Sequence, residues 1–129
     1  MEPTKHIGIV GVSAEGAALC YRTICAEGAV VLGPHNHPQI TMHTYPLSAY
    51  MRAIESNQWH DAGRLLLRSA KILADAGAEI LICPDNTVHQ ALDLVREQSP
   101  AKWLHIVEEV SAVAANRQYQ RQFCGVRLA

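Results

Sequence analysis

Four residues whose side chains could bind a ligand or transfer a proton follow one short apolar run in this chain. They are Asp85, Asn86, Thr87 and His89. The run before them, 80–82, is continuously apolar, which is typical of a strand buried on both faces of a parallel sheet. Pro84 has no N–H to give to a neighbouring strand, so we expect the strand to end before it. The sequence therefore predicts a carboxylate, an amide, a hydroxyl and an imidazole at the carboxyl end of a buried strand.

This turn has two interpretations. Asp, Asn and Thr all cap helix N-termini, where free backbone N–H groups and the helix dipole favour an anion. Ligands of open α/β sheets bind at the carboxyl ends of the strands, so the turn is a candidate anion site. An ordinary capped strand-to-helix turn explains the same residues equally well, and the pattern by itself leaves both open.

Ser13 is the corresponding residue after the first predicted strand, 6–12. It can cap the helix that follows, and Glu15 in the first turn complements the helix dipole. We expect Ser13 to contribute to the same crevice as Asn86 and Thr87. Plain capping is again the alternative.

The elements that must position these residues alternate along the chain. Strands are predicted at 6–12, 39–44, 79–83 and 103–107. Helices are predicted from Ser13 to near Gly28, over 47–56, over 58–76 with Gly77 as the stop signal, from 85 to 99, and over 108–118. Such alternation predicts a three-layer α/β sandwich around a four-stranded parallel sheet of flavodoxin- or Rossmann-like type. The sheet would have five strands if 122–128 joins it.

Composition excludes several classes of protein. With 129 residues, 49% hydrophobic and 18% charged, we expect one globular α/β domain over residues 1–129. A net charge of −1 with dispersed Lys and Arg argues against a nucleic-acid partner. Gly8, Gly11 and Gly16 do not form a dinucleotide-binding motif. His35 and His37 lack further ligands for a metal site, and we expect none.

No signal peptide or membrane-spanning run is apparent. The four cysteines are scattered, without the spacing of a metal site or redox pair. We therefore expect a cytoplasmic protein with reduced thiols and no membrane partner.

Several segments resemble the cofactor-independent aspartate/glutamate racemases, in their first domain, and the match extends to about Gln120. The segments are 8–11, 15–22, 37–39, 75–78 and, most specifically, 84–89. The resemblance implies an isomerase that acts on acidic amino acids without pyridoxal phosphate or another cofactor. It implies two similar α/β domains with the active site between them, and it places Asn86 and Thr87 at the substrate's α-carboxylate.

Two departures from the family pattern bear on activity. Asp85 stands where the family has a Cys that is one of two acid/base residues flanking the α-carbon. The partner Cys belongs to the second domain, which we expect to be absent here, and Cys124 lies too early to replace it. We therefore expect this chain to be inactive or feeble by itself.

Each candidate residue also has a structural alternative. Asp85 is the candidate proton-transfer residue, but helix N–H groups stabilise a carboxylate and make it a weak base for a carbon acid, so capping or lining the pocket is the alternative. For His89, a packed or surface position is the alternative to substrate binding. Cys83 is expected to be buried as a small apolar residue.

The functional hypotheses that remain open are three. The first is a racemase-like domain. The second is a module that binds a small carboxylate or another anion without turnover. The third is a homodimer in which two copies face each other and two Asp85 carboxylates lie across one cleft.

Overall fold

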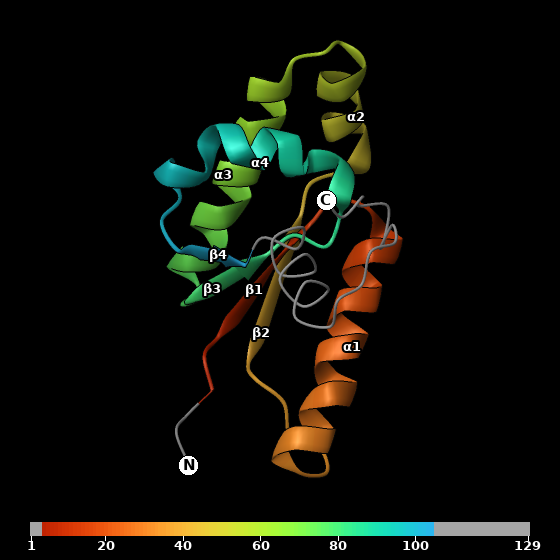
Figure 1. Ribbon diagram of the computed structural model, residues 1–129, viewed down its shortest axis with the longest axis vertical. Coiled ribbons are helices and arrows are strands. Elements are labelled where there is room, and N and C mark those ends of the chain that lie inside the picture. Colours follow the sequence, from red (N-terminus) through yellow and green to blue (C-terminus); the bar gives the residue numbers. More distant parts are fainter. Residues whose placement is uncertain (1–3, 105–129) are drawn as a thin grey trace, which may run out of the picture.

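The strands of the computed structural model form one parallel sheet in the order β2-β1-β3-β4 (Figure 1). The structure describes residues 4–104. Within them, the strands are β1 (Ile7–Gly11), β2 (Ile40–Thr44), β3 (Ile80–Ile82) and β4 (Lys102–Leu104). Ile7 is in register with Ile40 on one side and Ile80 on the other. This confirms the predicted parallel α/β fold, and the strand order is that of flavodoxin-like proteins.

The helices connect the strands in the predicted order. They are α1 (Ala14–Leu32), α2 (Leu47–Glu55), α3 (Trp59–Asp75) and α4 (His89–Val95). Short 3-10 turns flank α4, namely η1 (Asn86–Val88) and η2 (Arg96–Gln98). None of the helices in the described range is long and apolar enough to cross a membrane.

Two glycines on β1 reveal which helix covers which face of the sheet. A Cβ built at Gly8 would lie 3.2 Å from Leu73 of α3, whereas one built at Gly11 would lie 3.3 Å from Ala17 of α1. Positions 8 and 11 point to opposite faces, because side chains alternate along a strand. α1 therefore covers one face, and α3 covers the other with α2 and α4 packed beside it (Figure 1).

The main hydrophobic core lies on the α3 face. Its fully buried side chains come from all the elements on that face, and they include Tyr50, Leu66, Leu73, Leu81 and Leu92. Each such side chain contributes about 1.5–3 kcal/mol by leaving water. The core therefore fixes α2, α3 and α4 against β1 and β3, and with them the turn that carries the candidate residues.

Two predictions of helix extent were wrong. The helix predicted from 85 to 99 is α-helical only over His89–Val95, with a 3-10 turn on either side. The helix expected to end near Gly28 continues to Leu32, and Gly33 (φ 102°) follows it. Gly28 is buried inside α1, where a Cβ would lie 2.7 Å from His37 Cβ. Gly28 thus permits a close approach of the 33–39 loop to the helix and does not stop it. The segments predicted at 108–118 and 122–128, and Cys124, lie outside the described residues.

Candidate functional site

The carboxyl ends of β1 and β3 form the switch point of the sheet. From β1 the chain crosses to β2 on one side of β1, whereas β3 and then β4 lie on the other side. The loops that leave β1 and β3 therefore diverge at this edge, and crevices for ligands form at such points. Ser13 lies in the first loop and Asp85 in the second, as the sequence predicted.

Ser13 caps α1, which confirms the local prediction. Its backbone is extended (φ −93°, ψ 151°), and its Oγ accepts a hydrogen bond from the Gly16 backbone N–H at 3.1 Å. One of the unpaired N–H groups of the helix start is satisfied in this way.

Asp85 does not cap the turn that follows it. Its side chain makes no capping bond to η1. Instead, Oδ2 accepts a hydrogen bond from the Ser13 backbone N–H at 3.1 Å, and Oδ1 accepts one from Ser13 Oγ at 2.8 Å. The half-buried carboxylate thus links two loops that are 72 residues apart in the sequence. The capping alternative for Asp85 was therefore wrong for the helix that follows it, because the carboxylate bonds to the residue that caps α1.

Asn86 and Thr87 are exposed on η1, directly after Asp85. An amide and a hydroxyl are suitable donors for a carboxylate, but neither residue lines the hollow beside Ser13 that is described below. Their contact with a substrate stays a prediction.

His89 lies beneath this turn and not at its surface. Only 3% of the residue is exposed, and Nε2 lies 2.9 Å from the backbone O of Cys83. The imidazole therefore joins the start of α4 to the end of β3, which stabilises the turn that presents Asp85. Its role as a substrate contact stays a prediction, and this position favours the packed alternative.

Cys83 is buried, as expected. Burial raises the pKa of its thiol to about 12. The thiol therefore stays protonated near neutral pH and is a poor nucleophile or base. Although Cys83 is only two residues from Asp85, it does not replace the family's missing thiol.

A hollow of about 550 Å³ opens beside Ser13. Its lining comes from the start of α1 and from the end of β2, and includes Met42, Thr44, Tyr45 and Leu47. Sequence reasoning did not select these four residues. The signal was available, because 39–44 was predicted as a strand and its carboxyl end must lie at the same sheet edge as Ser13.

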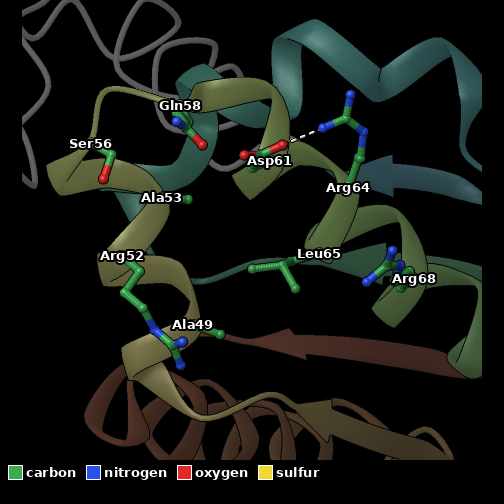
Figure 2. Close-up of a pocket in the computed structure, with 9 residues that line it drawn as sticks. All are labelled: Ala49, Arg52, Ala53, Ser56, Gln58, Asp61, Arg64, Leu65 and Arg68. Atoms are coloured by element: carbon green, nitrogen blue, oxygen red, sulfur yellow. Dashed lines mark hydrogen bonds and ion pairs between the residues drawn. The ribbon is translucent and has the colours of Figure 1, made fainter.

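A second hollow, of about 480 Å³, lies between α2 and α3 (Figure 2). It is lined by Arg52, Arg64 and Arg68 together with smaller residues. Arg64 turns toward Asp61, with which it forms an exposed ion pair, while Arg52 and Arg68 lie on either side of Leu65 (Figure 2). No predicted site residue lines this hollow, and its guanidinium groups do not converge on one point.

Comparisons with known proteins identify the family. The model of the Asp/Glu/Hydantoin racemase family matches residues 7–126. A candidate Asp/Glu racemase from Yersinia pestis is 25% identical in sequence, with a TM-score of 0.82 over 92% of this chain. An aspartate racemase homologue from Pyrococcus horikoshii OT3, 23% identical, has the same fold with a TM-score of 0.75 over 88%. The matches cover 52% and 50% of those two chains, so this chain spans about half their length.

Proposed function

Because this chain belongs to the Asp/Glu/Hydantoin racemase family, we propose that it supplies one half of a cofactor-independent racemase site for an acidic amino acid such as aspartate or glutamate. The observation that carries the proposal is the contact between Ser13 and Asp85 at the switch point of the sheet. It brings the two loops with the family's motifs together, and a hollow large enough for a small amino acid opens on the Ser13 side of this contact, lined by the start of α1 and the end of β2.

The proposed roles follow from the chemistry of each side chain. The amide of Asn86 and the hydroxyl of Thr87 donate hydrogen bonds to the substrate's α-carboxylate, which fixes the α-carbon beside Asp85. Asp85 removes or returns the α-proton on one face. Each oxygen of its carboxylate already accepts one hydrogen bond from Ser13 and keeps lone-pair capacity for a proton.

Racemisation requires a second proton-transfer group on the other face of the α-carbon. We propose that this group comes either from further polypeptide or from a second copy of the chain. A homodimer with two facing Asp85 carboxylates is one arrangement that meets the requirement. The mass of the protein in solution tests it, and a strictly monomeric mass in the presence of substrate would exclude it.

A second candidate function is favoured by the same contact. Asp85 stands in place of a thiol, and both of its oxygens are held by Ser13. Hydrogen bonds to both oxygens compete with uptake of the α-proton, which favours a module that binds a small carboxylate through Asn86 and Thr87 without turnover. The two candidates share the binding step and differ only in whether the α-proton exchanges.

Calorimetry and polarimetry together test the proposal. L- and D-aspartate, L- and D-glutamate and succinate are titrated into the full chain, and the same solutions are followed for loss of optical activity. Thr87→Ala should weaken binding by about tenfold, the usual effect of losing one hydrogen bond to a charged group. Thr23→Ala is the matched control, because Thr23 is exposed on α1 two or more turns beyond Ser13.

Each outcome decides between the candidates. Racemisation that Asp85→Asn abolishes supports the enzyme. Racemisation that survives Asp85→Asn removes Asp85 from the proton transfer. Binding without racemisation supports the binding module, and the absence of binding to all five compounds contradicts both.

A further inference from the structure

Gly16 does not have the positive φ angle that usually requires a glycine. It lies in the first turn of α1, and its φ is not among the positive values, which occur in the described glycines only at Gly33 and Gly77. A helix start normally prefers other residues, because glycine loses more backbone freedom on folding. The glycine at position 16 therefore needs another explanation.

Space supplies that explanation. A Cβ built on Gly16 would lie 2.9 Å from Oδ2 of Asp85 and 3.2 Å from Oδ1. Both distances are shorter than ordinary van der Waals contact between carbon and oxygen. A side chain at position 16 would thus meet the carboxylate of Asp85, and it would also lie 3.0 Å from Ser13 Oγ, the atom that donates a hydrogen bond to that carboxylate.

Ser13 holds the same carboxylate by two hydrogen bonds. Its backbone N–H and its hydroxyl bond to different oxygens of Asp85, which fixes the plane of the group as well as its position. The hydroxyl is itself oriented, because Oγ also accepts the Gly16 N–H. The two donors of Ser13 and the absence of a side chain at position 16 together allow this one orientation of the carboxylate.

We propose that Ser13 and Gly16 are positioning residues for Asp85, Ser13 through its two hydrogen bonds and Gly16 through its missing side chain. A Cβ at position 16 displaces the carboxylate from Ser13. The displacement needs only a rotation of the short Asp85 side chain, so the variant should fold. The effect of a fixed Asp85 carboxylate on the substrate rests on the proposed function, whereas the positioning of Asp85 by Ser13 and Gly16 does not.

Nuclear magnetic resonance of the full ¹⁵N-labelled chain tests the positioning directly. The Ser13 backbone amide reports the bond to Oδ2. Asp85→Ala removes the acceptor and should move the Ser13 amide proton upfield. Gly16→Ala should move the same resonance in the same direction, and the double variant should move it no further than Asp85→Ala alone.

Two controls separate positioning from a general effect on the helix. Ala18→Gly changes a neighbouring exposed position of α1 and should leave the Ser13 amide in place. Ser13→Thr keeps both donors and should preserve the wild-type signal, whereas Ser13→Ala should lose the part due to the hydroxyl. A Ser13 resonance that Gly16→Ala leaves unchanged, while Asp85→Ala moves it, would overturn the proposal.

Stability provides a second and independent measurement. Alanine is the better helix former, so Gly16→Ala should raise the folding equilibrium constant once Asp85 is also alanine. In the wild type the gain in this constant should be severalfold smaller. If the Gly16→Ala chain does not fold, the inference is still testable, because adding Asp85→Ala should restore folding. Equal effects of Gly16→Ala in both backgrounds would contradict the inference.

A titration with aspartate connects positioning to function. Gly16→Ala and Asp85→Ala should change the affinity for aspartate in the same direction, and their effects should not multiply in the double variant. If the wild type binds none of the tested amino acids, the proposed function fails while the amide shifts still decide the positioning.

Discussion

Replacing Ser13 by alanine should destabilise the protein by about 2 kcal/mol. The hydroxyl makes two bonds that alanine cannot make, one from the Gly16 N–H at 3.1 Å and one to Asp85 Oδ1 at 2.8 Å. Loss of a serine N-cap costs about 1 kcal/mol. A hydrogen bond to a charged group is worth about 1.5–3 kcal/mol when buried, and we take about 1 kcal/mol because Ser13 and Asp85 are only half-buried. The sum corresponds to about a 30-fold larger unfolding constant.

Urea unfolding followed by circular dichroism measures this loss. In the Asp85→Ala background, Ser13→Ala should cost only the cap, about 1 kcal/mol, so the coupling between the two positions is also about 1 kcal/mol. Ser13→Thr should retain most of the stability. Ser48→Ala, at an exposed serine in the first turn of α2, is the control and should change stability by less than about 0.5 kcal/mol. An equal loss with and without Asp85, or a loss below about 0.5 kcal/mol, would refute the assigned contact.

Four further predictions concern the interior. At pH 8, iodoacetamide should label Cys25 about tenfold or more faster than Cys83, as measured by peptide mass spectrometry, because burial raises the pKa of the Cys83 thiol to about 12 and keeps it protonated. The unfolded chain loses the Cys83 thiol proton at lower pH than the folded chain, so the free energy of unfolding should fall as the pH rises from the ordinary thiol pKa of 9.0 toward about 12. Cys83→Ala should remove this part of the decline. Gly28→Ala should lower the urea midpoint, because the added Cβ would lie 2.8 Å from His37 Cα. Overpacking costs about 1–3 kcal/mol, which is more than the gain in helix propensity from alanine. A higher midpoint would contradict the contact. Tyr50→Phe should leave stability unchanged or raise it by up to about 1 kcal/mol, since the buried Tyr50 hydroxyl has no hydrogen-bond partner in the part of the chain that the structure describes; a loss of more than about 1 kcal/mol would indicate a partner.

Local signals in the sequence were sufficient for much of the fold. The apolar run at 80–82, the cap at Ser13 and the stop at Gly77 each act through bonds or propensities within a few residues. Alternation of strands and helices then limits the sheet to a parallel one with right-handed crossovers. The position of the candidate site at the carboxyl edge follows from that architecture.

The same local signals misassigned Gly28 and gave no structural role to Gly16. They predict a helix stop at Gly28, and they show only that Gly16 completes no dinucleotide-binding motif. Both are glycine because another segment approaches the helix, His37 in one case and Asp85 in the other. A close approach between distant segments leaves no periodic or capping pattern, so only the tertiary structure identifies it.

The turn at 84–89 illustrates the division most clearly. Its sequence determined that polar groups follow a buried strand and that a carboxylate would lie at a helix start. The strand order decided which helix, because placing β3 beside β1 brings the Asp85 carboxylate to the N–H and hydroxyl of Ser13. It also left His89 inside, bonded to the end of β3. Composition and capping fix what each residue can do, whereas the pairing of strands far apart in the chain fixes which residues do it together.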